Sequence, residues 1–261
     1  MPVLNDLDLL IKAAQAAGEI ARPFWRKHPK IWDKGDGAGP VTEADLAVDK
    51  MLHDTLLTAR PSYGWLSEET TDTDTRLSKE HVFIVDPIDG TRSFIEGDHN
   101  WAHSLAVVEN GEVVAAVVYL PMRKRLFAAQ KGLGATLNGA PLKTSTMQEL
   151  DGARLLTARH NLVPQFWQNG CPDFVQKFRP SLAYRMSLVA EGRFDAMLSL
   201  RNTWEWDVAA GTLIANEAGA QVTDRNGDAP VFNQSTPAFD GFIAANPVLA
   251  SSIAARLMRK T

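Results

Sequence analysis

The chain is poor in cysteine and has no excess of positive charge. It carries one cysteine, Cys171, among 261 residues, so no disulfide can form within it and a reducing, cytoplasmic location is expected. The formal net charge is −4 at pH 7. Proteins whose main partner is nucleic acid or an anionic membrane usually present a basic face. We therefore expect neither partner, and we expect Cys171 to be a half-buried loop residue and not a nucleophile.

Long apolar runs are also absent. The stretch 4–26 is too polar for a transmembrane helix or a signal peptide, and its pattern predicts an amphipathic helix over about 4–27, capped by Asn5. Polar and charged residues interrupt it: Asp6, Asp8, Lys12, Gln15 and Glu19. The 6 histidines show no zinc-ligand spacing such as His-Glu-x-x-His. A zinc hydrolase is therefore not predicted.

The most informative stretch is Val-Asp-Pro-Ile-Asp-Gly-Thr at residues 85–91. Residues 81–85 predict a buried strand, and Pro87 is expected to end it because proline lacks an N–H and fixes φ. Asp86 and Asp89 would then lie at the carboxyl edge of a sheet, where α/β proteins bind ligands. Carboxylates this close are costly unless neutralised, and a divalent cation neutralises them with hard oxygen ligands. Alone, the stretch is equally compatible with an ordinary turn.

Two further segments place carboxylates in comparable positions. Ser67-Glu68-Glu69 follows a short apolar segment, and Asp207 opens a helix of small residues that is predicted to run to about Glu217. Acidic strand or loop ends that are each followed by a helix start fit one carboxylate-rich pocket better than three unrelated turns.

Together with Val41-Thr42-Glu43-Ala44-Asp45, these segments resemble the inositol monophosphatase family of metal-dependent, lithium-sensitive phosphomonoesterases. The segments stand in the family's order, and the resemblance spans the chain. It implies an α/β (α+β layered) protein, a five-layer αβαβα sandwich of the sugar-phosphatase type. It also implies an enzyme, usually a homodimer, that hydrolyses small phosphate monoesters with Mg²⁺.

The helix and strand signals fall into two groups. We predict an N-terminal α+β half, residues 1–150, with most of the metal ligands, and a C-terminal α/β half, residues 151–261, which closes the active site. The halves are expected to pack together. The first half contains a helix over 42–59 and strands over 104–108, 113–119 and 125–130, with turns at Asn110-Gly111 and Asn138-Gly139. The second contains strands near 155 and over 194–200, 221–223 and 241–245, and helices from about 164, over 184–191, from 207 and after 247.

The carboxylates suit phosphoryl transfer. A phosphate monoester is a dianion, and its hydrolysis pushes negative charge onto the equatorial and leaving oxygens. Two or three Mg²⁺ ions would absorb that charge, orient the ester and lower the pKa of a bound water. The family resemblance implies that Asp86 bridges two ions. It assigns Glu68 and the Ile88 carbonyl to the first ion, and Asp89 and Asp207 to the second.

Gly90 and Thr91 are expected to contact the phosphate. Residues 91–95 predict a helical turn with free N–H groups at its start, and Gly90 has no Cβ to block the approach of the backbone. In the family pattern, the Thr91 hydroxyl pairs with Asp45 to orient and deprotonate the attacking water, with Glu68 assisting. Taken alone, Thr91 would be an ordinary helix cap and Asp45 a solvated acid.

The substrate stays open at this level. Residues 203–207 and 188–192 resemble the 3′(2′),5′-bisphosphate nucleotidase branch, whereas residues 89–95 resemble the histidinol-phosphatase branch. Inositol phosphatases typically have Gly-Ser-Ala-Ala where this chain has Pro-Ser-Leu-Ala at 180–183, and an acid where it has Leu200. We rank 3′-phosphoadenosine 5′-phosphate slightly ahead of inositol 1-phosphate, with histidinol phosphate and fructose 1,6-bisphosphate behind.

Three arginines are candidates to meet additional substrate charge: Arg159, Arg185 and Arg201. The alternative of another class is a non-catalytic regulator that binds a phosphorylated metabolite. Such a protein would be expected to lack a metal ligand, and none is missing from this chain.

Overall fold

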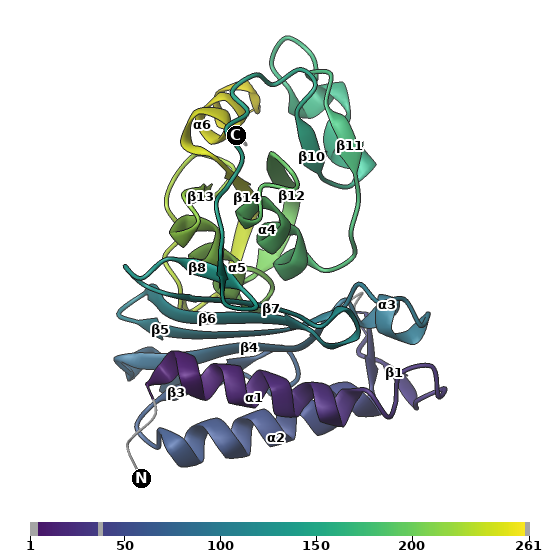
Figure 1. Cartoon of the computed structure of the whole chain (residues 1–261), viewed down its shortest axis with the longest axis vertical. Helices are drawn as coiled ribbons and strands as arrows, with labels where there is room; N and C mark the ends of the chain where they lie inside the picture. Colours follow the sequence, from purple (N-terminus) through teal and green to yellow (C-terminus); the bar gives the residue numbers. More distant parts are fainter. Residues whose placement is uncertain (1–4, 36–38, 259–261) are drawn as a thin grey trace.

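The computed structural model describes residues 5–35 and 39–258, which form five layers (Figure 1). Helices α1 (Asp6–Ala21) and α2 (Glu43–Ala59) cover one face of a seven-stranded sheet. Helices α4 (Leu182–Ala190) and α5 (Glu205–Glu217) lie between that sheet and a five-stranded one. Helix α6 (Pro247–Arg256) lies outside the second sheet. The predicted αβαβα sandwich is confirmed.

The seven-stranded sheet has its strands in chain order, β3 to β9. Only β3 and β4 are parallel; the other neighbours are antiparallel. The strands are β3 (Gly64–Ser67), β4 (His81–Asp89), β5 (Ala102–Glu109), β6 (Glu112–Leu120), β7 (Arg125–Gln130), β8 (Ala135–Leu137) and β9 (Ala140–Pro141). Asn110-Gly111 and Asn138-Gly139 both have positive φ at each residue. The two predicted tight turns are confirmed, because a primed turn requires that conformation.

The second sheet has the order β11-β10-β12-β14-β13. Its strands are β10 (Arg154–Leu156), β11 (Val175–Lys177), β12 (Ala196–Trp204), β13 (Gln221–Thr223) and β14 (Ala238–Ala245). Short elements complete the described structure: β1 (Ile31–Asp33), β2 (Pro40–Thr42), α3 (Thr91–Ile95) and the 3₁₀ turns η1 (Asp74–Ser78), η2 (Pro121–Arg123), η3 (Arg159–Leu162) and η4 (Pro164–Phe166).

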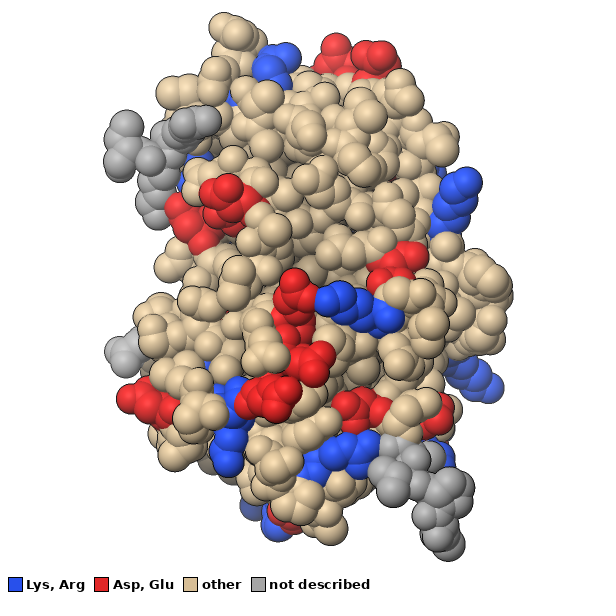
Figure 2. All heavy atoms as spheres, turned by 90° about the vertical axis from the view of Figure 1, so that its left-hand side faces the viewer, with Lys and Arg blue, Asp and Glu red and all other residues tan. Residues whose placement is uncertain are grey.

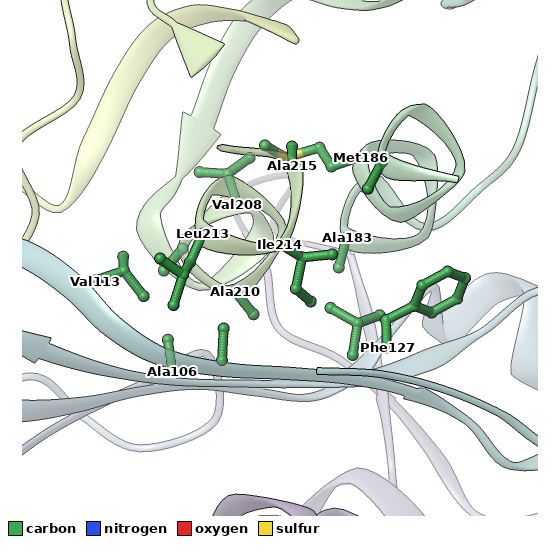
Figure 3. Packing of buried hydrophobic residues seen from close by; sticks show 14 of the residues in the cluster. Ala106, Val113, Phe127, Ala183, Met186, Val208, Ala210, Leu213, Ile214 and Ala215 are labelled. Atoms are coloured by element: carbon green, nitrogen blue, oxygen red, sulfur yellow. The ribbon is translucent and has the colours of Figure 1, made fainter. Parts of the chain in front are cut away.

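The layers are held together by three hydrophobic cores. Side chains alternate across β4: Val82 and Ile84 join the core beneath α4 and α5, whereas Phe83 and Val85 join the core of α1 and α2. Figure 3 shows α5 packed onto the sheet through residues that include Ile214. The third core lies between the second sheet and α6. A strand buried on both faces needs a continuous apolar run, which is what residues 82–85 provide.

Small residues bring α4 and α5 close together. A Cβ added at Gly211 of α5 would lie 2.8 Å from the Met186 Cβ of α4, so a larger residue there would push the helices apart. Both helices belong to the C-terminal part of the chain but share a core with the seven-stranded sheet. The division near residue 150 stays a prediction; β9 ends at Pro141 and β10 begins at Arg154.

The expectation that Pro87 ends its strand is wrong. Strand β4 continues to Asp89, and its register against β5 shifts between Asp86 and Asp89. A β-bulge accommodates a residue without an N–H, so the chain stays in the sheet.

Other boundaries also differ from the predictions. Helix α1 ends at Ala21, before Pro23, and Leu4 lies outside the described residues. The helix expected from about 164 is wrong: only the turn η4 forms there, and Asn169 and Gly170 adopt positive φ soon after. Strand β12 runs to Trp204, so α5 starts at Glu205, two residues before the predicted start. Within the described residues, no helix is both long and apolar enough to cross a membrane.

Candidate active site

Three buried carboxylates meet where β4 ends and α5 begins. One carboxylate oxygen from each of Asp86, Asp89 and Asp207 lies within 4.8 Å of the others. Residues three apart on a regular strand face opposite sides of the sheet. The bulge inserts one extra residue, because Asp86 pairs with Ser104 and Asp89 with Ala102, and it therefore turns both carboxylates to the same side.

Nearby positive charge only partly compensates these carboxylates: the ion pair of Asp207 is a 3.8 Å contact with Arg201, whose side chain is 60% exposed. Burial raises the pKa of Asp207 to about 8, and the charges of Asp89 and Glu68 add to this. Burial also raises the pKa of Asp89 to about 6 and that of Asp86 well above its ordinary value. Asp86 Oδ1 is buried and has no hydrogen-bond partner among the described residues. A set of hard oxygens with an unsatisfied member fits a divalent cation such as Mg²⁺.

The start of α4 holds Asp89 in place. Ser181 Oγ donates to Asp89 Oδ2 at 2.6 Å, and the Ala183 and Leu182 amides donate to its two oxygens at 2.7 and 3.3 Å. Ser181 also caps α4 by accepting from the Tyr184 amide. Pro-Ser-Leu-Ala departs from the family's Gly-Ser-Ala-Ala, but the groups used here are a serine hydroxyl and backbone N–H groups, which both sequences supply.

Glu68 lies beside the end of β4, where its amide donates to the Val85 carbonyl at 3.2 Å. Its carboxylate is 2.8 Å from Lys34 Nζ, which also contacts Glu69 at 2.7 Å. Burial and the charge of Glu68 raise the pKa of Glu69 to about 7, although Lys34 opposes the shift. Sequence reasoning included Glu69 in the acidic segment 67–69 but gave it no role, and it did not identify Lys34. Nothing local distinguishes Lys34 from a solvated lysine, because its partners are distant in the sequence.

Asp45 contacts both the start of α2 and the Thr91 hydroxyl. It closes a capping box at the start of α2, where the Thr42 amide donates to Asp45 Oδ2 at 2.9 Å. Thr91 Oγ1 lies 3.3 Å from Asp45 Oδ1 and 3.2 Å from the Ile88 carbonyl oxygen. Burial raises the pKa of Asp45 to about 6. Asp45 is 1% exposed and therefore not a solvated acid.

Gly90 lies between the carboxylate turn and α3. Its φ of 99° belongs to the left-handed region, which non-glycine residues avoid. A Cβ there would lie 3.3 Å from the Asn100 carbonyl oxygen. The turn therefore packs closely against the segment that leads into β5.

Two of the three candidate arginines lie near the carboxylates. Arg201 Nη2 is 3.8 Å from Asp207 Oδ2, with a side chain that is 60% exposed. Arg185 is 6% exposed and packs its guanidinium 4.5 Å from the centre of the Phe178 ring. Burial lowers the pKa of Arg185 to about 10, although the charge of Asp89 raises it. Arg159 is exposed and forms no ion pair within the described part of the chain.

Two tryptophans flank this end of α5. The rings of Trp204 and Trp206 stack with centroids 4.9 Å apart and an interplanar angle of 9°. Trp204 is 44% exposed, and Trp206 immediately precedes Asp207. An exposed indole face therefore stands at the helix end that carries one of the three carboxylates.

A second acidic group lies at the opposite end of β4. Glu80, His81 and Glu109 also offer ligand atoms within 4.8 Å of one another. Figure 1 shows β4 starting on the left-hand side, away from α3, and Figure 2 shows acidic side chains gathered across the middle of that face. His81 Nε2 is 3.2 Å from Glu109 Oε1, and its ring stacks on Tyr63.

Comparison with known proteins gives a consistent result. The model of the inositol monophosphatase family matches residues 5–261. The Nus factor SuhB of Escherichia coli strain K12 is 33% identical over 238 residues, which cover 87% of this chain and 86% of that protein. Inositol monophosphatase 3 of Solanum lycopersicum is 35% identical over 232 residues, 85% of this chain and 86% of its own. A solved IMPase of Thermotoga maritima has a TM-score of 0.84 at 28% identity, covering 97% of this chain and 96% of that one.

Proposed function

The chain belongs to the inositol monophosphatase family and is a phosphoric monoester hydrolase, and we propose that it hydrolyses a small phosphate monoester with Mg²⁺ at Asp86, Asp89 and Asp207. The observation that carries this proposal is the buried Asp86 Oδ1, which has no hydrogen-bond partner among the described residues and lies within a cluster of carboxylates. Such a group is costly unless a cation completes it.

The residues that would hold two or three Mg²⁺ ions are Glu68, Asp86, Asp89, Asp207 and the carbonyl of Ile88. Bound Mg²⁺ supplies positive charge that neutralises phosphate oxygens and makes water more acidic. The protein's part is to fix the ligands. Ser181 and the first amides of α4 orient Asp89, and the bulge aims Asp86 toward the same space.

Thr91 and Asp45 would handle the proton of the attacking water. Thr91 Oγ1 is held between Asp45 Oδ1 and the Ile88 carbonyl. In the proposed step, the water gives a proton to Thr91 Oγ1 as Thr91 passes its own to Asp45, and Glu68 assists in orienting the water. A carboxyl group whose pKa is raised to about 6 is suited to this exchange near neutral pH. The backbone of Gly90 and Thr91 would contact the phosphoryl oxygens.

For the substrate, we propose a nucleoside bisphosphate, 3′-phosphoadenosine 5′-phosphate, ahead of inositol 1-phosphate. A second phosphate needs a cation away from the metals, and Arg185 and Arg201 lie near Asp89 and Asp207. Arg159 is a weaker candidate. Leu200, where inositol phosphatases typically carry an acid, removes an acceptor for polyol hydroxyls. The names of the relatives support inositol 1-phosphate as the second candidate; histidinol phosphate and fructose 1,6-bisphosphate follow.

A non-catalytic regulatory role is the alternative of another class. The relative named Nus factor SuhB favours it, whereas the complete set of acidic ligands favours catalysis. The family's homodimer, lithium sensitivity and cytoplasmic location stay predictions for this chain.

A phosphate-release screen over the four substrates tests the proposal. Each is assayed with Mg²⁺ and with EDTA, and initial rates give kcat/KM. We expect release from at least one substrate with Mg²⁺ and none with EDTA. Full activity in EDTA would contradict the metal site. No release from any of the four, by a protein that binds Mg²⁺, would favour the regulatory alternative.

A further inference from the structure

His103 is a polar residue inside the core of the N-terminal half. It lies on β5 and is 0% exposed, with Trp101 and Tyr119 beside its ring. Its Nδ1 is within hydrogen-bond distance of the Pro87 carbonyl. Burial lowers the pKa of His103 to about 4, so the neutral ring carries one N–H. Because a carbonyl only accepts, that proton is on Nδ1.

Pro87 belongs to the bulge that orients the carboxylates. The register pairs Asp86 with Ser104 and Asp89 with Ala102, so Pro87 and Ile88 together face His103 across the two strands. An extra residue in a bulge leaves the ladder locally unpaired. The His103 side chain replaces the missing partner for the Pro87 carbonyl.

The adjacent carbonyl has a different partner. The Ile88 carbonyl accepts from Thr91 Oγ1 at 3.2 Å, so the two carbonyls between Asp86 and Asp89 are each held by a side chain. Packing alone does not account for a histidine at this position. Its Nε2 is buried without a partner among the described residues, and an aliphatic side chain would fill the space without burying that polar atom.

We propose that His103 is a positioning residue for the metal site, which holds the Pro87 carbonyl and thereby fixes the peptide planes that place Asp86, the Ile88 carbonyl and Asp89. The inference rests on the proposed function, since it takes these groups as Mg²⁺ ligands. His103 does not touch the substrate. Its loss should therefore weaken metal binding first, and leave KM for the substrate unchanged at saturating Mg²⁺.

The test compares His103→Leu with His103→Asn. Leucine removes the donor at similar volume, whereas the asparagine amide nitrogen can occupy the position of Nδ1 and donate to the same carbonyl. Isothermal titration calorimetry of the EDTA-treated proteins measures Mg²⁺ binding directly, and the Mg²⁺ dependence of activity gives a second reading. We expect the leucine variant to bind Mg²⁺ about tenfold to a hundredfold more weakly, and the asparagine variant to recover most of that loss.

Leu105→Val is the matched control. Leu105 is fully buried two residues along the same strand and pairs with Val85, so the change loosens the same core without removing a contact to Pro87. It should lower Tm and leave Mg²⁺ affinity unchanged. If His103→Leu does not fold, His103→Val repeats the test with a smaller side chain.

If His103→Leu bound Mg²⁺ with wild-type affinity, the inference would be overturned. So would an equal loss of affinity in Leu105→Val, because the effect would then come from general loosening of the core. A wild-type protein that does not bind Mg²⁺ at all would instead contradict the proposed function.

Discussion

The two acidic groups at opposite ends of β4 are both compact but have different surroundings. Each contains three residues with ligand atoms within 4.8 Å. Asp86 and Asp89 are 1% and 5% exposed, whereas the side chains of His81 and Glu109 are 25% and 43% exposed and pair with each other. Water and neighbouring side chains stabilise the surface group, whereas the buried carboxylates are only partly compensated by the exposed Arg201 and a bound cation would complete their neutralisation. Burial with incomplete counter-charge distinguishes a metal site better than the number of carboxylates.

Asp86→Asn is the substitution with the largest expected effect on the buried group. It removes a charge from the buried group, and we expect kcat/KM to fall by about 10² to 10³ with the fold retained. The metal-free protein should become more stable, because carboxylate repulsion is relieved. Activity assays and thermal unfolding in EDTA measure both effects. Retention of more than about a tenth of wild-type activity would refute the role of Asp86.

Arg185→Ala tests whether the arginine near the buried carboxylates also contributes to substrate selection. If a nucleoside bisphosphate is bound, KM for it should rise about tenfold to a hundredfold, or about 1.4 to 2.8 kcal/mol, while turnover of a simple monophosphate changes little. Arg159→Ala and Arg201→Ala, assayed on both substrates, serve as comparisons. If no variant separates the two substrates, a small monophosphate becomes the preferred substrate.

The pH dependence of stability should also distinguish the buried acidic group from the exposed one. The pKa of Asp89 is raised to about 6 and that of Asp207 to about 8, from an unfolded value near 3.8. Between these values the folded protein binds more protons than the unfolded chain, so the free energy of unfolding falls as pH rises. We expect a loss of about 5 kcal/mol between pH 5 and pH 8 without metal, most of it from Asp207. Urea unfolding in EDTA at several pH values measures this loss, and saturating Mg²⁺ should abolish it. If the free energy of unfolding in EDTA did not change with pH, the raised pKa values of the buried carboxylates would be contradicted.

The smallest expected effect is that of Glu109→Gln. It removes a carboxylate from the exposed group, where the contact with His81 contributes less than about 1 kcal/mol. Both kcat/KM and Mg²⁺ affinity should stay within about twofold of wild type, as judged by the same assays. A large loss of Mg²⁺ affinity would show that the surface group binds the ion, and the distinction by burial would fail.

Local signals predicted much of the fold. The turns at Asn110-Gly111 and Asn138-Gly139 follow from residues that tolerate positive φ, and the apolar run before Asp86 predicted a strand. The sequence also predicted that Asp86, Asp89 and Asp207 lie close together, as they do, although Asp86 and Asp89 lie within β4 and not after it.

The remaining features depend on pairing across the fold. Pro87 stays in its strand because β5 accepts a bulge opposite it, and no local pattern carries that information. Lys34 reaches Glu68 only once β1 and β3 are in place. His103 is an isolated histidine in an apolar strand, and only the observed register places it opposite Pro87.

The hydrogen bonds from the start of α4 to Asp89 have a consequence for the order of events in folding. Ser181 and Asp89 are 92 residues apart, so their contact closes a long loop and gains nothing until both sheets have formed. The carboxylates should then come together late in folding, after the rate-limiting barrier. A cation that binds only the completed cluster would leave the folding rate almost unchanged and slow unfolding, so the metal would lengthen the lifetime of the native state.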